Sequence, residues 1–454
     1  MIGDALSNGA ATVEPNDGAV TANEVEHDTQ RDAASGAPDA PKRKRGSFFA
    51  PIRIANFRRL VAGQTISRFG DQFYYLAIPW LVLRITPSPL VLAAVLGVAS
   101  LSLGIFTLVG GVLADRLGPR TLMMAADAAR LVIMATLAAL ALLMQAPPLW
   151  SIIALSALLG LASGLFYPAS GAMIPYLVPK DDLQAANSYD QLTFQSANFI
   201  GPGIAGALLS ATQLAVGFVV DTASFVISLL TLASLRMPKR ERVASEGAKP
   251  RGGMASLGEG FRFLLNTKFL VTLLGVSLLG SLAINGLFDV GLPLLLKQRV
   301  GLMGGPQAQG IVVGGFGLGS VLGAVIAGVT GRVSHKPLVG ILLFVPFAAL
   351  TAVVPLVPGL LPMAVVFAVM GLVGAASNVL LVTVIQSFIP LDMMGRITSF
   401  MMLGSFLGAP LSIFIYGGLA TVVPSVSWLF YGGAILMGLA LLIALTRKVV
   451  WQTA

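Results

Sequence analysis

Long apolar runs constrain this chain more than any other feature of its sequence. Twelve such runs are bounded by turn residues or charges. A hydrocarbon layer of about 30 Å is crossed by a helix of about 20 apolar residues, and backbone groups in lipid must be hydrogen-bonded within their own segment. No run alternates in the way that a membrane β-strand does. The sequence therefore predicts an all-α integral membrane protein with 12 transmembrane helices. These spans are residues 60–85, 89–113, 121–144, 149–176, 189–211, 214–235, 269–296, 308–331, 337–356, 359–386, 397–420 and 425–446.

Composition agrees with a lipid environment and excludes several kinds of chemistry. The chain is 56% hydrophobic and 11% charged, against roughly 25% charged in soluble proteins. It has no cysteine and only two histidines, His27 and His335, so thiol chemistry is excluded and a histidine metal site has no basis. No nucleophile–histidine pair and no phosphate-binding loop is present. We expect no enzyme activity, no cofactor and no metal.

The distribution of basic residues predicts the orientation of the spans. With the N-terminus inside, 24 of the 29 lysines and arginines fall in cytoplasmic segments, and the outer loops hold only Arg84, Lys297 and Arg299. This bias places both termini in the cytoplasm of a multi-pass protein of the cell's inner (plasma) membrane. The basic run 42–45 is better interpreted as an anchor of this kind than as a nuclear signal or a headgroup-binding patch. The net charge of +9 is thus a topology signal, and we expect no nucleic-acid partner.

The polar segments divide the chain into four parts. Residues 1–50 are acidic and hold almost no large apolar residue before Phe48, which predicts a disordered cytoplasmic tail. Residues 51–236 are predicted to form a six-helix bundle, 237–268 a cytoplasmic connector, and 269–454 a second six-helix bundle.

An internal repeat supports this division. Pro179, Asp181 and Ser188, between the fourth and fifth spans, recur at a constant offset of 211 between the tenth and eleventh spans. Two sets of six spans joined by a polar connector are typical of a duplicated transporter with two pseudo-symmetric bundles.

The ten residues 111–120 form a charged hairpin between the second and third spans. They contain an acid, two bases and three residues suited to close approach or sharp turning, Gly111, Gly118 and Pro119. This combination favours a hinge between two moving helices over an inert connector.

This hairpin resembles the signature loop of the major facilitator superfamily, G-x-L-A-D-R-x-G-R-[RK]. The matching residues are Gly111, Leu113, Ala114, Asp115, Arg116, Gly118 and Arg120, whereas Pro119 departs from the usual basic residue. The fifth span is similar to the antiporter signature G-P-x-x-G-G through Gly201, Pro202, Gly203 and Gly206, with Ala205 at its first closing glycine. The segment from Gly70 to Trp80 looks like the drug:proton antiporter branch that holds macrolide-efflux proteins and the enterobactin exporter. The resemblance covers about residues 50–450.

The resemblance implies a conformational latch at the hairpin. Asp115 would contact the start of the eleventh span, near Arg396, with Gly111, Arg116, Gly118 and Arg120 shaping the loop. The alternative is that Asp115 only caps the hairpin. In the fifth span, Pro202 and the neighbouring motif glycines would seal a leak path between the two halves. The alternative is that these small residues only allow close helix packing.

Acids inside the membrane are costly and usually functional. Asp71 lies about midway along the first span with Arg68 one turn earlier, and we expect these two residues to carry proton coupling, unless they form a structural pair. Asp127 and Arg130, at i and i+3, are predicted to form a structural ion pair. Asp221 is a weaker candidate for coupling, as is Asp289.

Aromatic and polar side chains near the centre of the spans are candidates for a substrate cavity. These are Phe73, Tyr74, Phe166, Tyr167, Asn285, Phe288 and Asp289. Each aromatic ring could instead serve packing. No cluster of arginines or lysines lies within the spans, which argues against phosphorylated cargo and favours an amphipathic or weakly cationic compound.

Together these features predict a secondary active exporter of lipophilic drugs or related small molecules, working by alternating access and proton antiport. Its partners would be the small-molecule substrate, protons and the lipid bilayer, and we expect a monomer. A siderophore or lysolipid exporter on the same fold is the nearest alternative. A membrane sensor or anchor that keeps the fold without transport is another.

Overall fold

The structure is a computed structural model, and it describes residues 49–144, 146–236, 268–329, 336–388 and 394–446. The regular structure of these residues is helical throughout, which confirms the all-α prediction. We call residues 49–236 the first half and residues 268–446 the second half. The tail and the connector fall almost entirely outside the described residues, so their predicted roles are not addressed by the structure.

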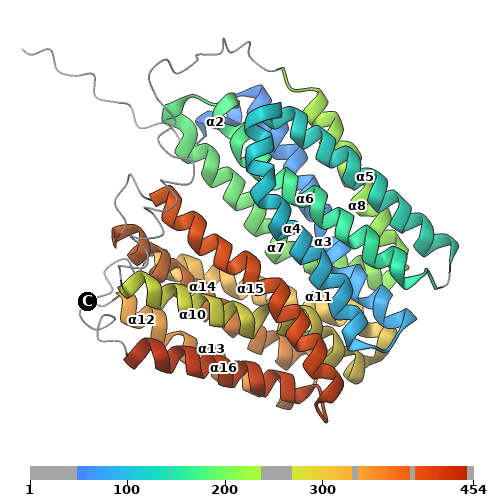
Figure 1. Cartoon of the computed structure of the whole chain (residues 1–454), viewed down its shortest axis with the longest axis vertical. Helices are drawn as coiled ribbons and strands as arrows, with labels where there is room; N and C mark the ends of the chain where they lie inside the picture. Colours follow the sequence, from blue (N-terminus) through green and yellow to red (C-terminus); the bar gives the residue numbers. More distant parts are fainter. Residues whose placement is uncertain (1–48, 145, 237–267, 330–335, 389–393, 447–454) are drawn as a thin grey trace, which may run out of the picture. The chain divides into compact units, whose positions relative to one another are not determined.

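The first half begins with a short turn and then runs through long helices (Figure 1). Its elements are α2 (Ala50–Arg53), α3 (Ala55–Ile85), α4 (Pro89–Leu117), α5 (Pro119–Leu143), α6 (Leu149–Leu177), η1 (Lys180–Asp182), α7 (Leu183–Ala211) and α8 (Leu214–Ala233). Local sequence explains several ends. Ser88 accepts a hydrogen bond from the Val91 N–H at the start of α4, and Pro89 follows it at the first helical position. Gly118, at φ 84°, ends α4 and lets α5 begin at once with Pro119.

The second half contains shorter and interrupted helices. Its elements are α10 (Lys268–Gly286), the π-helical turn η2 (Leu287–Gly291), α11 (Leu292–Val329), α12 (Lys336–Leu342), α13 (Phe344–Val353), η3 (Val354–Leu356), α14 (Leu360–Phe388), α15 (Met394–Val422) and α16 (Ser427–Thr446). Gly301 has φ 70° inside α11 and divides it into two helices across a kink.

Within the described residues, each apolar run expected from the sequence is helical over most of its length. In the part of the chain that the structure describes, eight helical stretches are long and apolar enough to cross a membrane, and one of them, Leu274–Gly328, includes the break at Gly301. The helices α3 and α7 are 31 and 29 residues long but carry more polar and charged side chains. The multi-pass character is therefore supported by composition and length. The number of spans and their grouping into two bundles stay predictions.

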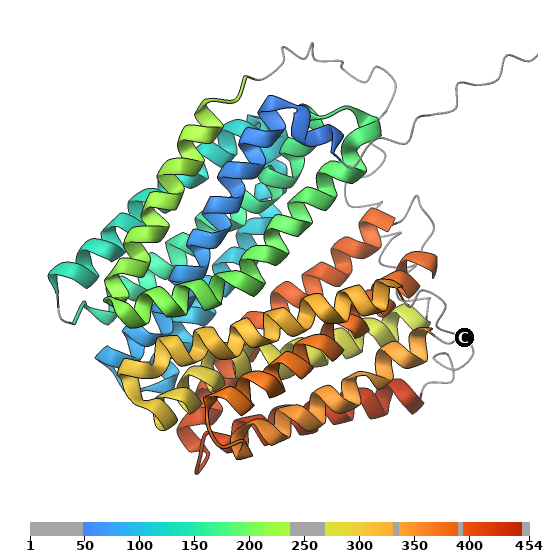
Figure 2. The same cartoon turned by 180° about the vertical axis from the view of Figure 1, so that it is seen from behind.

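Contacts between helices position the site. Within the first half α4 packs on α6 and α3 packs on α8, while in the second half α11 packs on α14 and α10 on α15. The two halves meet where α7 lies along α11 and where α4 lies along α15. Figures 1 and 2 show these pairs from opposite sides.

Candidate functional site

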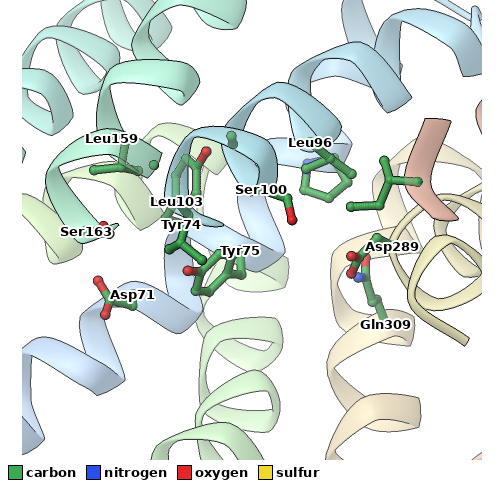
Figure 3. Close-up of a pocket in the computed structure, with 14 residues that line it drawn as sticks. Asp71, Tyr74, Tyr75, Leu96, Ser100, Leu103, Leu159, Ser163, Asp289 and Gln309 are labelled. Carbon is green, nitrogen blue, oxygen red and sulfur yellow. The ribbon is translucent and has the colours of Figure 1, made fainter. Parts of the chain in front are cut away.

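A cavity of about 230 Å³ lies where helices of both halves come together. The first half contributes α3, α4 and α6, and the second contributes η2, α11 and α15 (Figure 3). Its walls mix apolar side chains with a few hydroxyl, amide and carboxyl groups. The lining residues are Asp71, Tyr74, Tyr75, Pro79, Leu96, Ala99, Ser100, Leu103, Leu159, Gly160, Ser163, Asp289, Gln309 and Ile413.

Two carboxylates face this cavity from opposite sides. Asp71 comes from α3, and Asp289 comes from η2 on the other side, with Tyr75 and Ser100 between them in the view of Figure 3. The π-helical turn that carries Asp289 is the kind of local irregularity that often marks a functional position. Among the described lining residues, Asp71 and Asp289 are the carboxyl groups, and no arginine or lysine is present.

Two of the seven residues expected in the cavity, Tyr74 and Asp289, line it. Phe73 instead belongs to the buried core, at 6% exposure. On α3 the cavity is lined instead by Asp71, Tyr74, Tyr75 and Pro79.

The remaining four candidates are not among the lining residues, although Tyr167 interacts with the lining residue Tyr75. Phe166 contacts the Tyr167 ring, with 6.2 Å between centroids. Phe288 packs against other phenylalanine rings of the second half. Asn285 donates to the backbone and side-chain oxygens of Ser281, one turn earlier in α10. The alternative interpretation of the aromatic rings was packing, and Phe73, Phe166 and Phe288 do pack against other side chains.

Behind the cavity, Arg130 of α5 connects two aspartates. Its guanidinium pairs with Asp127 one turn earlier, and its Nη1 lies 4.0 Å from Asp71 Oδ1. Arg130 and Asp127 are buried, with side chains 1% and 0% exposed. The guanidinium also lies over the Phe166 ring at 3.8 Å and the Phe225 ring at 4.6 Å. The local i, i+3 pair is present as expected, and it extends to Asp71 on a different helix.

Asp127 has a second support. The Ser228 hydroxyl of α8 donates to Asp127 Oδ2 at 2.6 Å, and the Gln64 amide donates to Ser228 Oγ at 3.5 Å. A buried carboxylate that is both paired and hydrogen-bonded is fixed in place. Asp127 therefore holds Arg130, while Asp71 keeps access to the cavity.

Arg68 has a partner other than the one expected. The sequence suggested a pair with Asp71, but the Arg68 guanidinium binds Asp190 of α7 at 2.6 Å. It also donates to the Asp190 backbone carbonyl and to the Thr193 hydroxyl. The long arginine side chain reaches across to the neighbouring helix, where three acceptors lie within one turn. Arg68 therefore ties α3 to α7, and Asp71 has Arg130 as its nearest cation.

Asp221 of α8 is a buried carboxyl that sequence analysis ranked low. It is 1% exposed, and Ser224 Oγ lies 3.2 Å from its Oδ1. Its Oδ2 has no hydrogen-bond partner in the described structure. The charges of Asp71, Asp127 and Arg130 act on it electrostatically. An aspartate in a 20-residue apolar helix is the sequence signal that could have raised its rank.

The hairpin between α4 and α5 is built as a tight turn. Arg120 donates to the carbonyls of Leu232 and Ala233 at the end of α8, at 3.0 and 2.8 Å. Arg120 thus satisfies the last carbonyls of a helix, a favourable place for a cation. Arg116 and Asp115 are exposed, and Asp115 forms no ion pair within the described residues. Arg396 lies in α15, but its side chain is outside the described part of the structure, so the latch contact is not visible.

The glycine-proline segment of α7 lies against α11 of the other half. A Cβ at Gly206 would clash with the Gly310 Cα and the Pro306 carbonyl, and a Cβ at Gly310 would clash with the Pro202 carbonyl. Only glycine permits this approach of two backbones. A Cβ at Gly203 would meet nothing within 4 Å.

Two hydrogen bonds also join α3 of the first half to α11 of the second. Trp80 Nε1 donates to Gln309 Oε1 at 2.6 Å, and Lys297 Nζ donates to the Leu83 carbonyl at 3.2 Å. Trp80 is 1% exposed. Gln309 both lines the cavity and holds this contact, a role that the sequence analysis missed.

Known transporters share this sequence pattern over most of the chain. The profile of the Major Facilitator Superfamily matches residues 60–413. The multidrug efflux pump Tap of Mycolicibacterium fortuitum is 26% identical over 377 residues, which are 82% of this chain and 89% of Tap. Macrolide efflux protein A of Streptococcus pyogenes is 25% identical, over 87% of this chain and 96% of its own length. The enterobactin exporter EntS of Escherichia coli O1:K1 / APEC is 29% identical, over 75% and 80%.

The fold also resembles solved structures. The nucleoside transporter NupG superposes with a TM-score of 0.63 at 12% identity, and the match covers 87% of this chain and 99% of NupG. At this identity the likeness concerns the fold alone.

Proposed function

We propose that this chain, which belongs to the Major Facilitator Superfamily, exports amphipathic and weakly cationic small molecules in exchange for protons. Membership of this family makes it a transporter and not an enzyme, and its relatives include efflux proteins for drugs, macrolides and enterobactin. Lipophilic drugs are the substrate class that the cavity fits best, because its apolar walls carry two carboxylates and no described cation.

The position of Asp71 is the observation that carries this proposal. Its carboxylate lines the cavity and lies 4.0 Å from the buried guanidinium of Arg130. Its side chain is 14% exposed. Asp71 can therefore receive a proton or a cation from the cavity while it stays in contact with a fixed positive charge.

Exchange follows from competition at this carboxylate. An ionised Asp71 can bind a cationic substrate, and a protonated Asp71 cannot. A proton that enters from one side therefore releases the substrate, and loss of that proton restores the binding site. Asp289, across the cavity, provides a second carboxylate for a cationic group. Alternation between inward and outward access turns this competition into antiport.

The proposal includes the membrane arrangement. Twelve spans form two pseudo-symmetric six-helix bundles, with both termini in the cytoplasm and the cavity at their interface, in the plasma membrane. Residues 1–50 form a cytoplasmic tail and 237–268 a cytoplasmic connector, and the protein acts as a monomer. The hairpin residue Asp115 latches onto the start of α15 near Arg396 when the cytoplasmic side closes. The Gly206–Gly310 contact of α7 and α11 supports the proposed seal between the halves.

A siderophore exporter is the second candidate, because the enterobactin exporter is among the relatives. An anionic catecholate would need cationic groups in the cavity. The described lining has Asp71 and Asp289 instead, and this favours the cationic class.

Transport in proteoliposomes tests the proposal. The full chain is reconstituted with an imposed pH gradient, and movement of ethidium and erythromycin is followed. We expect both probes to move against their gradients only when the pH gradient is present, and Asp71→Asn to abolish this dependence. Asp181→Asn, at an exposed position in η1, is the matched control and should behave like the wild type. Accumulation that ignores the pH gradient would exclude proton antiport.

A further inference from the structure

Asp221 lies deeper than Asp71 and has no partner for half of its carboxyl group. The side chain is 1% exposed, and Oδ2 is among the buried polar atoms without a hydrogen bond in the described structure. A functional role for this second carboxyl rests on the proposed proton antiport and extends it.

Asp221 belongs to a buried cluster of interacting groups from three helices. Asp71 and Tyr74 lie on α3, Asp127 and Arg130 on α5, and Asp221 and Ser224 on α8. Within this set there are three carboxyl groups and one guanidinium. If all three carboxyls were ionised, the buried cluster would have a net charge of −2.

The guanidinium of Arg130 has other partners than Asp221. Arg130 pairs with Asp127, lies 4.0 Å from Asp71, and has Phe166 and Phe225 against its faces. Asp127 has the additional hydrogen bond from Ser228. No further cation contacts Asp221 among the described residues. An ionised carboxylate in such a place is strongly disfavoured, and the neutral acid is not.

We propose that Asp221 is a second proton-binding residue of the transporter, which holds a proton while Asp71 pairs with Arg130. Asp71 and Asp221 then both take part in proton coupling, one at the cavity wall and one buried behind it. Asp71 exchanges with the cavity directly, and Asp221 stores a proton behind it.

Tyr74 connects the two environments. It is one of the cavity-lining residues, and its hydroxyl is buried. The hydroxyl lies within electrostatic range of Asp221 and close to the Ser156 hydroxyl. A hydroxyl both donates and accepts. Tyr74 is therefore the side chain that would relay a proton between Asp221 and the cavity, once side-chain motion brings the two groups within hydrogen-bonding distance, and the tyrosine would be neutral before and after the transfer.

Glycine at position 70 allows this arrangement. A Cβ at Gly70 would clash with the Ser224 hydroxyl and lie 2.8 Å from Asp221 Oδ1. The α8 carboxyl therefore lies directly against the α3 backbone, next to Asp71. This approach places Asp221 among the coupling residues although it lines no cavity wall.

The protonation state can be measured without any substrate. Infrared spectra of the purified, reconstituted full chain at neutral pH should contain a carbonyl band of a protonated carboxylic acid in an apolar site. We expect Asp221→Asn to remove this band, Asp221→Glu to shift it, and the exposed Asp181→Asn control to leave it unchanged. A wild-type spectrum without such a band would overturn the proposal before any variant is made. Loss of the band in Asp71→Asn together with its persistence in Asp221→Asn would also overturn it.

Proton counting tests the functional part of the inference. Proton uptake per ethidium exported is measured in proteoliposomes with an internal pH dye. We expect Asp221→Asn to lower this ratio about twofold, and Tyr74→Phe to slow proton uptake while the infrared band remains. An unchanged ratio in Asp221→Asn, even with the band removed, would make Asp221 a structural acid and overturn its role in coupling. If the wild type shows the band but no pH-driven transport, the proposed function fails while the protonated site stands.

Discussion

Arg130 lies between two aspartates that differ in their access to the cavity. Asp71, 4.0 Å from Arg130 Nη1, lines the cavity, whereas Asp127 is fully buried and held by Ser228. One guanidinium therefore serves a fixed carboxylate and an accessible one. This difference separates the structural role of Asp127 from the coupling role proposed for Asp71.

Replacement of Arg130 by methionine should destabilise the protein strongly. Breaking a buried pair leaves an uncompensated charge and costs about 3–5 kcal/mol, here at Asp127. Thermal unfolding in detergent should show a large decrease in midpoint for Arg130→Met. The double variant Arg130→Met with Asp127→Leu should recover part of it, because the fully buried carboxylate at position 127 is then gone. A single variant as stable as the wild type would contradict the structural role of the pair.

The fold could be predicted from sequence because lipid imposes one demand on the backbone. Each apolar run must satisfy its own hydrogen bonds, so the runs predict helices, and Pro89 and Gly118 mark helix ends through local backbone preferences. The break at Gly301 within α11 agrees with the expected boundary between two runs. The sequence did not reveal the π-helical turn that carries Asp289, because no residue pattern specifies it.

Sequence could point to site residues of two kinds: acids within apolar spans, and charged pairs one turn apart on the same helix. Asp71 and Asp289 stand out because acids are costly in membranes, and the Asp127–Arg130 pair follows from helical spacing. The partner of Asp71 was not predictable, because Arg130 lies on another helix and the spacing within α3 pointed to Arg68. Gln309 was missed because its role depends on Trp80, 229 positions away in sequence.

The contact between α7 and α11 predicts a sharp difference between two neighbouring glycines. Gly206→Ala should impair transport and cost roughly 1–3 kcal/mol, because its Cβ would overlap the backbone of α11. Gly203→Ala should be tolerated, because a Cβ there meets nothing within 4 Å. Both variants are compared by thermal unfolding and by ethidium efflux from cells. Equal behaviour of the two would show that the close approach is not required.

The latch hypothesis predicts a transport defect without a folding defect at Asp115. This residue is exposed and forms no ion pair within the described part of the chain. Asp115→Asn should therefore leave membrane insertion unchanged and the stability within about 0.5 kcal/mol of wild type, while efflux is lost. Insertion is measured by membrane fractionation and stability by thermal unfolding, with Asp181→Asn as the surface control. Normal efflux by Asp115→Asn would restrict this residue to a capping role.

The hydrogen bond from Trp80 to Gln309 predicts a change in access to the cavity from the side where α3 ends. The bond is 2.6 Å long, joins the two halves and is buried at Trp80. Gln309→Leu keeps approximate volume but leaves the indole N–H without an acceptor, at a cost of about 1–3 kcal/mol, so the closed arrangement of these ends becomes less populated. A labelling experiment measures this change in access. The chain has no cysteine, so Ser100→Cys in the cavity wall provides a single labelling site without further changes.

External maleimide should label Cys at position 100 several-fold faster when Gln309→Leu is added. The control Gln213→Leu, at an exposed loop position, should not change the rate. Equal labelling rates would mean that this bond does not hold α3 and α11 together.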